Sequence, residues 1–207
     1  MRTGLLLSGG MDSLCIARWK RPDVAITIDY GQLPAAAEIE ASSAICKRLS
    51  IDHHVISVDC SALGSGDMAG EPANANAPAS DWWPYRNQLL VTLSAMRALV
   101  LGVTHLFLGT VKSDESHRDG TREFIAALSG LLHLQEGALV ISAPAIHLST
   151  TELVRLSGVT SDQLAWAHSC HKSCVACGSC RGCNKYFDVL REIADDVGRP
   201  RQPLSAG

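Results

Sequence analysis

Short apolar runs alternate with longer amphipathic stretches along most of this chain. The short runs are typical of strands buried on both faces, whereas apolar residues in the longer stretches recur at helical spacing. Strands that alternate with helices form a parallel sheet with helices on both faces. The pattern therefore predicts an α/β fold with a five-stranded parallel sheet. Strands are expected at residues 4–7, 24–28, 54–58, 105–108 and 138–142, and helices at 12–19, 34–49, 88–101, 123–134 and 151–156.

Two segments interrupt this alternation. Residues 61–80 are rich in Gly, Ala, Pro, Asn and Ser and show no periodicity, which is typical of a mobile loop or lid. The last residues are expected to be a disordered tail. We therefore expect an α/β domain over 1–160, a small C-terminal module with a final helix over 161–197, and a tail over 198–207.

Composition narrows the class of protein. The 207 residues are 46% hydrophobic, which is enough for a full core and excludes disorder throughout. Lys and Arg number 18 against 21 Asp and Glu, and the resulting net charge of −3 argues against a generic nucleic-acid binder. No apolar window is long enough for a membrane span, and the first apolar run is too short for a signal peptide. A cytoplasmic protein is expected.

A Ser-Gly-Gly-Met-Asp-Ser string at residues 8–13 lies between the first predicted strand and helix. Glycines allow an anion to approach the backbone, serines add hydroxyl donors, and a helix N-terminus presents unpaired N–H groups. Asp12 within such a loop indicates a metal ion, Mg²⁺, bound together with a polyphosphate. An ordinary strand-to-helix turn is the alternative, but the full string in this position favours phosphate binding.

Five of the eight cysteines fall within residues 170–183. Four of them have intervals of six, two and two residues, and the closely spaced pairs favour a closed tetrahedral Zn²⁺ site. An iron–sulfur cluster would use the same thiolates, and a redox relay is a third interpretation. The predicted ligands are Cys170, Cys177, Cys180 and Cys183, with Cys174 as a fifth candidate.

The string at 8–13 resembles the PP-loop of the ATP-pyrophosphatase superfamily. Asp-Tyr-Gly-Gln follows at 29–32, Pro-Tyr-Arg-Asn at 84–87, and a Cys-Gly-x-Cys-x-x-Cys knuckle near the C-terminus. In this order, over about residues 4–190, the chain resembles the QueC family of 7-cyano-7-deazaguanine synthases. The resemblance implies a Rossmann-like fold of the adenine nucleotide alpha hydrolase type, with structural zinc. It also implies an AMP-forming carbon–nitrogen ligase in queuosine biosynthesis.

The implied reaction adenylates the carboxylate of 7-carboxy-7-deazaguanine with ATP and Mg²⁺, after which ammonia gives the amide and then the nitrile. Asp12, Ser13 and Arg86 would serve catalysis, and Cys174 would be the thiol left over from the zinc site. For Asp29, capping a turn is an equal alternative to contacting ribose. The residues implied to bind nucleotide or substrate are Ser8, Gly9, Gly10, Asp12, Ser13, Asp29, Tyr30 and Asn87.

Residues 114–124 and 167–171 depart from the usual QueC pattern, whereas the PP-loop does not. Three other functions stay open, and these differences favour the first of them. A QueC-like paralogue, as in anti-phage defence, would join the activated deazaguanine to a protein or nucleic-acid amine. A PP-loop sulfurtransferase would modify a tRNA base through a catalytic cysteine such as Cys174. A zinc-stabilised nucleotide sensor would bind ATP without turnover. QueC-like enzymes are commonly homodimers, so the resemblance allows a homodimer, but nothing in the sequence identifies an interface.

Overall fold

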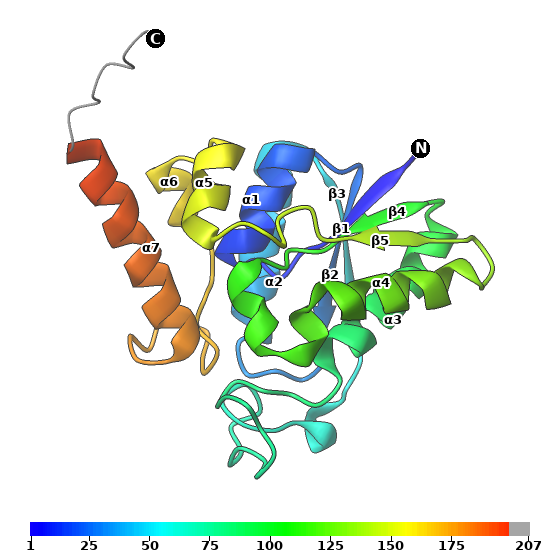
Figure 1. Cartoon of the computed structure of the whole chain (residues 1–207), viewed down its shortest axis with the longest axis horizontal. Helices are drawn as coiled ribbons and strands as arrows, with labels where there is room; N and C mark the ends of the chain where they lie inside the picture. The colour runs from blue at the N-terminus through cyan, green and yellow to red at the C-terminus, as the bar shows by residue number, and fades with distance from the viewer. Residues whose placement is uncertain (199–207) are drawn as a thin grey trace, which may run out of the picture.

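Five parallel strands form the centre of the structure. The computed structural model describes residues 1–198, with side chains to Asp195. The sheet order is β3-β2-β1-β4-β5, so β1 is central and the chain crosses the sheet between β3 and β4 (Figure 1). This confirms the predicted five-stranded parallel sheet. The strands are β1 (Thr3–Leu6), β2 (Val24–Asp29), β3 (Asp52–Ser57), β4 (His105–Phe107) and β5 (Val140–Ser142).

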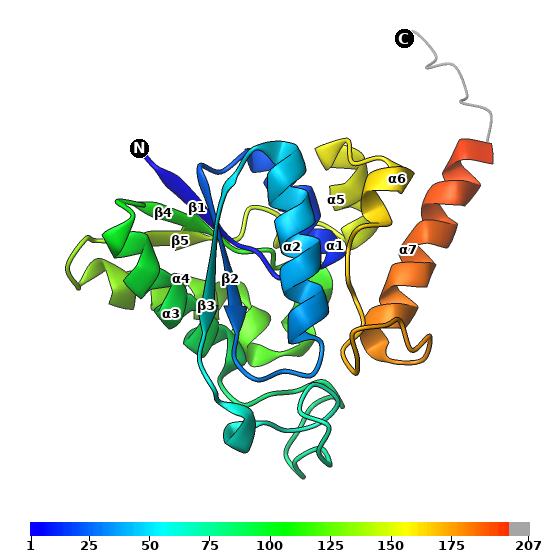
Figure 2. The ribbon, with the colours of Figure 1, turned by 180° about the vertical axis from the view of Figure 1, so that it is seen from behind.

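Helices cover both faces of the sheet, as predicted. In Figure 2, β2 and β3 stand between α2 on one side and α3 on the other. The C-terminal α7 lies beyond α5 and α6, at the far side from β4 and β5 (Figure 1). The helices are α1 (Met11–Lys20), α2 (Ala35–Leu49), α3 (Arg86–Val100), α4 (Arg122–His133), α5 (Thr150–Ser157), α6 (Ser161–Leu164) and α7 (Arg181–Gly198).

Side chains of the central strands point alternately into two separate hydrophobic cores. Leu5 of β1 packs with α1, α2 and α5, and Val189 brings α7 into the same core. Ile26 of β2 packs into the other core with α3 and α4. Because successive residues of a strand point to opposite faces, one short apolar run supplies both cores.

The observed elements differ from the expected ones mainly at their ends. Strand β3 begins two residues before the expected start because Asp52 and His53 pair with β2 although they are polar. Strand β5 begins later than expected, after Ala138 adopts a left-handed φ of 44°. The tail expected over 198–207 lies outside the described residues, except for Gly198 at the end of α7.

The segment after β3 is partly anchored to the body of the protein. A 3₁₀ turn (Ser61–Leu63) opens it, and the backbone N–H of Leu33 donates to the carbonyl of Met68 at 2.8 Å. Met68 is buried beside Trp83, whose ring meets that of Tyr30 edge-on at 4.9 Å. The region expected to be a mobile loop therefore contributes to one wall of the site described below.

Candidate functional site

The Ser-Gly-Gly-Met-Asp-Ser loop connects the carboxyl end of β1 to α1. Gly9 adopts a left-handed φ of 73°, which brings the loop against α2. The Ser13 hydroxyl donates to the carbonyl of Gly10 at 2.9 Å and lies 3.2 Å from the Ser8 hydroxyl. No side chain caps the N-terminus of α1, so N–H groups of its first turn are available to an anion. The loop has the features of a phosphate-binding turn.

A cavity of about 930 Å³ opens at this loop. Its walls come from the loop, from β2, from α3, from the residues after β4, and from the cysteine-rich segment with the start of α7. Ligands of parallel sheets bind at the carboxyl ends of the strands, where this cavity lies. The predicted site residues that line it are Ser8, Gly10, Asp12, Ser13, Tyr30, Arg86, Asn87 and Cys170.

Asp12 is held from two sides by residues distant in the sequence. Its Oδ1 accepts a hydrogen bond from the Thr150 hydroxyl at 2.7 Å, and its Oδ2 accepts one from Lys185 Nζ at 2.8 Å. Burial raises the pKa of Asp12, and the ammonium of Lys185 opposes this shift. Burial acts to lower the pKa of Lys185, but the charges of Asp12 and Asp114 outweigh it, so the net shift is upward.

A second carboxylate, Asp114, lies on the same side of the cavity. Its Oδ2 accepts from the backbone N–H of Val111 at 3.0 Å, while its Oδ1 is 4.0 Å from Lys185 Nζ. Carboxylates are the ligands that Mg²⁺ prefers, so the donor chemistry fits the expected ion. Both oxygens of Asp12, however, already accept protein hydrogen bonds, and Lys185 stands between the two carboxylates.

Arg86 begins α3 and points into the opposite wall. Its guanidinium lies 2.8 Å from the Met68 sulfur. Burial would lower the pKa of Arg86, yet the neighbouring Tyr30, Asp119, Asp81 and Glu38 raise it. Burial also raises the pKa of Glu38 to about 7, although the Gln32 amide donates to this carboxylate at 2.8 Å. This wall therefore combines a fixed cation with an acid that titrates near neutral pH.

Three other predicted residues have structural partners. The Asn87 amide donates to the carbonyl of Asp119 at 3.0 Å, which fixes the turn before α4. Asp29 does not line the cavity; its Oδ1 accepts from the backbone N–H of Gly31 at 3.1 Å and so caps a turn. Gly9 also lies outside the cavity wall, in contact with α2. Asp29 and Gly9 therefore shape the site without facing its interior, whereas Asn87 also lines the cavity.

A buried carboxylate, Asp81, lies beside an arginine and two histidines from three segments of the chain. Its side chain is only 7% exposed and lies 3.4 Å from Arg181, 3.4 Å from His171 and 3.9 Å from His117. Burial acts to raise the pKa of Asp81, but electrostatic interaction with His171, Arg181 and Arg86 holds it below its ordinary value. Arg181 in turn donates to His117 at 2.7 Å and to Ser116 at 2.8 Å. The group fixes the far wall of the cavity.

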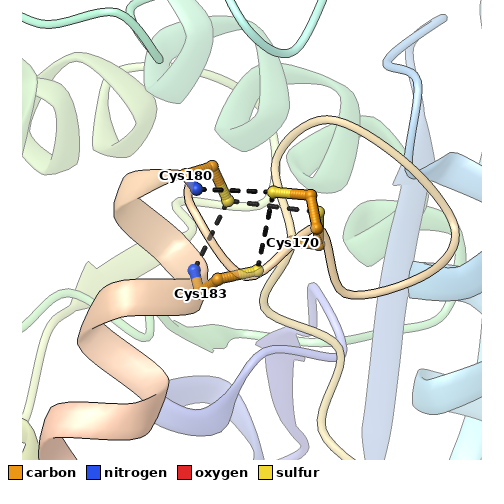
Figure 3. A group of neighbouring side chains, drawn as sticks. Cys170, Cys180 and Cys183 are labelled. Atoms are coloured by element: carbon orange, nitrogen blue, oxygen red, sulfur yellow. Dashed lines mark hydrogen bonds between the residues drawn. The ribbon is translucent and has the colours of Figure 1, made fainter.

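The cysteine-rich segment brings four thiols together. The Sγ atoms of Cys170, Cys177, Cys180 and Cys183 all lie within 4.8 Å of one another. Figure 3 shows Cys170 on the incoming loop and Cys180 and Cys183 at the start of α7, with their sulfurs facing one another. Backbone N–H groups donate to the sulfurs, as from His171 to Cys180 at 3.4 Å. Such N–H groups lower the pKa of Cys177 to about 6.

These distances suit one tetrahedral metal ion. Zinc–sulfur bonds of about 2.3 Å place thiolates roughly 3.8 Å apart, and the sulfurs of Cys177 and Cys183 are 3.9 Å apart, with Cys170 and Cys180 at 4.0 Å. An iron–sulfur cluster, which has several metal atoms between its thiolates, requires wider spacing. Cys174 is outside the group: it is exposed, and its thiol lies 3.7 Å from the carbonyl of Leu33.

Sequence reasoning did not identify four of the charged groups in the cavity: Lys185, Glu38, Asp81 and Arg181. Two signals were available for them. Asp81 closely precedes the Pro-Tyr-Arg-Asn string, and Lys185 follows the last clustered cysteine by two residues. Neither signal shows that the side chains meet, because the contact between Lys185 and Asp12 spans 173 residues.

Comparison with known proteins agrees with this architecture. The chain matches the family described as "Queuosine biosynthesis protein QueC" over residues 3–193. It is 31% identical to the 7-cyano-7-deazaguanine synthase of Desulforudis audaxviator over 89% of this chain and 94% of that protein. Identity to the corresponding synthase of Chlorobium phaeobacteroides is also 31%, over 95% of each chain.

A solved structure shares the fold. The U34-tRNA thiolase NcsA from Methanococcus maripaludis, described with its 4Fe–4S cluster, superposes with a TM-score of 0.53 at 13% identity, covering all of this chain and 75% of that one. Among the described residues, no helix is long and apolar enough to cross a membrane. The match over almost the whole length, with the PP-loop at the sheet edge, shows that the chain is an enzyme of the QueC family, within the PP-loop ATP pyrophosphatases.

Proposed function

We propose that the protein activates the carboxylate of 7-carboxy-7-deazaguanine with ATP. A carboxylate oxygen attacks the α-phosphorus, the bond to the β-phosphate breaks, and pyrophosphate leaves. Ammonia then attacks the acyl carbon, and AMP departs to give the amide. A second ATP activates the amide oxygen, and loss of that oxygen gives the nitrile named in the relatives' activity, 7-cyano-7-deazaguanine.

One observation carries this proposal: the PP-loop and a wall of buried charged groups face the same cavity. At about 930 Å³ the cavity is at the upper end of the roughly 300–1,000 Å³ range for small-molecule sites, which suits a nucleotide beside a second ligand. Holding two reactants in line contributes much of the rate acceleration of such a reaction.

The residues of the loop have distinct tasks in this scheme. Backbone N–H groups at the start of α1 and the Ser8 and Ser13 hydroxyls bind phosphate oxygens. Mg²⁺, when bound by Asp12, would neutralise phosphate charge and favour loss of pyrophosphate. Arg86 supplies a second, fixed positive charge on the opposite wall, where negative charge develops at the α-phosphate.

The four clustered thiols hold a structural zinc ion in this proposal. Zinc has a full set of four ligands there, and a closed site of this kind stabilises local structure rather than reacting with substrate. Its place in the wall of the cavity means that it also orders the residues around Asp81. Thiols persist in a reducing compartment, so we place the enzyme in the cytoplasm.

The reaction is tested by mixing purified protein, ATP, Mg²⁺ and 7-carboxy-7-deazaguanine and measuring nucleotides by chromatography. We expect AMP and pyrophosphate, with neither formed when 7-deazaguanine lacking the carboxylate replaces the acid. S13A should lower the rate about 10- to 100-fold because a phosphate-binding hydroxyl is lost. S43A, an exposed serine on α2, should leave it unchanged. ADP as the product, or no turnover of the acid, would contradict the proposal.

The mass of the product separates the possible acceptors. With ammonium present we expect the amide followed by the nitrile. A product in which the acid is joined to a protein or nucleic-acid amine would mean that adenylation occurs as proposed and that this amine, in place of ammonia, is the acceptor. Incorporation of sulfur into a tRNA base, together with loss of activity in C174S, would replace the proposal with the sulfurtransferase alternative.

A further inference from the structure

Lys185 reaches the PP-loop from the far end of the chain. It lies at the start of the second turn of α7, with its Nζ 2.8 Å from Asp12 Oδ2 and 4.0 Å from Asp114 Oδ1. Its side chain is 34% exposed, and it lines the cavity together with the loop. A lysine at this point places a mobile positive charge beside the loop that would hold phosphates.

The two arginines of the cavity are bound to other groups, and Lys112, which also lines it, is exposed. Arg181 is bound to Asp81, His117 and Ser116, and Arg86 lies against Met68 on the opposite wall. Lys185 is the cation that contacts the PP-loop carboxylate itself. Lysine has a flexible stem and three donors, so it can change partners without movement of the backbone.

We propose that Lys185 is a phosphate-binding residue that exchanges partners when nucleotide binds. In the free enzyme it neutralises Asp12. When a triphosphate occupies the PP-loop, its ammonium binds phosphate oxygens and releases Asp12 Oδ2, the atom that a divalent cation needs. The inference rests on the use of ATP in the proposed function, and it assigns Lys185 a role in ATP binding.

The position of Lys185 links the cysteine cluster to the nucleotide site. Lys185 follows Cys183 by two residues, and both lie in the first turns of α7. The thiols of Cys180 and Cys183 are buried in the cluster, which fixes how α7 begins. The C-terminal module thus contributes a ligand-binding residue to the site of the α/β domain.

The test compares K185M, K185R and R191M with the wild-type protein. Arg191 is on the same helix, is 74% exposed and does not itself line the cavity, although its partner Asp188 does, so R191M controls for loss of a charge on α7. Calorimetry measures binding of pyrophosphate and of α,β-methylene-ATP, and electron paramagnetic resonance measures binding of Mn²⁺ without nucleotide. Metal content and thermal unfolding show whether each variant is folded.

Two affinities should move in opposite directions in K185M. Affinity for pyrophosphate and for the ATP analogue should fall about 10- to 100-fold, the range for loss of a hydrogen bond to a charged group. Affinity for Mn²⁺ alone should rise about tenfold, because a cation has been removed from between two carboxylates. K185R should bind the phosphates within about threefold of wild type, since the charge remains, and R191M should change neither affinity.

A merely structural role would lower both affinities together, so that result overturns the proposal. Equal phosphate affinity in K185M and wild type overturns it as well. If K185M does not fold, K185R decides: retained phosphate binding supports the role, and loss of binding in that folded variant overturns it. Wild-type protein that binds ATP but does not turn over the acid would contradict the proposed function and leave the role of Lys185 intact.

Discussion

Replacing Gly9 by alanine should destabilise the whole protein, because the PP-loop turns too close to α2 for a side chain. At the φ of 73° an added Cβ would lie 2.6 Å from the carbonyl oxygen of Glu38, 3.0 Å from the Ala41 Cβ and 3.1 Å from the Ser42 hydroxyl. The nearest of these atoms is helix backbone and cannot rotate away. The loop or α2 must shift to admit the methyl group.

The expected cost has two parts. A left-handed conformation costs a residue with a Cβ about 1–2 kcal/mol, and overpacking of a close contact costs about 1–3 kcal/mol. The free energy of unfolding of G9A should therefore fall by about 2–5 kcal/mol, which lowers Tm by roughly 4–20 °C in a chain of this size.

Gly10 provides the matched control. Its φ is −76°, and an added Cβ would lie 3.4 Å from the Ser8 hydroxyl, which is an ordinary contact. G10A should lose less than about 1 kcal/mol in urea denaturation, even though Gly10 lines the cavity. Wild-type stability in G9A, or equal destabilisation of the two variants, would refute the steric argument.

C180A should lose the bound metal and the order of α7, detected by metal analysis and limited proteolysis, whereas C174S should retain one metal ion per chain because all four clustered thiols remain. D81N should lower the free energy of unfolding by about 1–3 kcal/mol in urea denaturation, less than for a fully buried pair because Arg181 is 39% exposed. The raised pKa of Glu38, about 7, means that this group stabilises the fold below its ordinary pKa of 4.5 and loses that contribution as pH rises to about 7. Relative to wild type, E38Q should gain up to about 1.4 kcal/mol per pH unit in this window, and a constant difference would contradict the shift.

The fold was predictable because short apolar runs and helical spacing show which face of each element is buried. The ends of the strands and helices were harder to predict. At β3 the polar Asp52 and His53 join the sheet through backbone pairing, which cannot be predicted from the hydrophobicity of their side chains. The short α6 and the 3₁₀ turns contain too few residues to show any periodicity. Burial of Met68 depends on contacts with Tyr30 and Trp83 that no local pattern shows.

The site was predictable where its parts are contiguous. The PP-loop and the cysteine spacing are local patterns whose chemistry can be inferred from residue types. Lys185 and Asp81 become recognisable only when the fold brings them to the cavity, because their partners lie far away in the sequence. For Asp29 both interpretations were equal from the sequence, and the structure shows its carboxylate capping a turn.

Transfer of labelled oxygen tests the central claim of carboxylate adenylation most directly. The assay uses 7-carboxy-7-deazaguanine with oxygen-18 in its carboxylate, together with ATP, Mg²⁺ and ammonium, and measures the AMP by mass spectrometry. If a carboxylate oxygen attacks the α-phosphorus, the departing AMP carries one labelled oxygen from the acid. Unlabelled AMP from that reaction, or label found in inorganic phosphate beside ADP, would contradict the account.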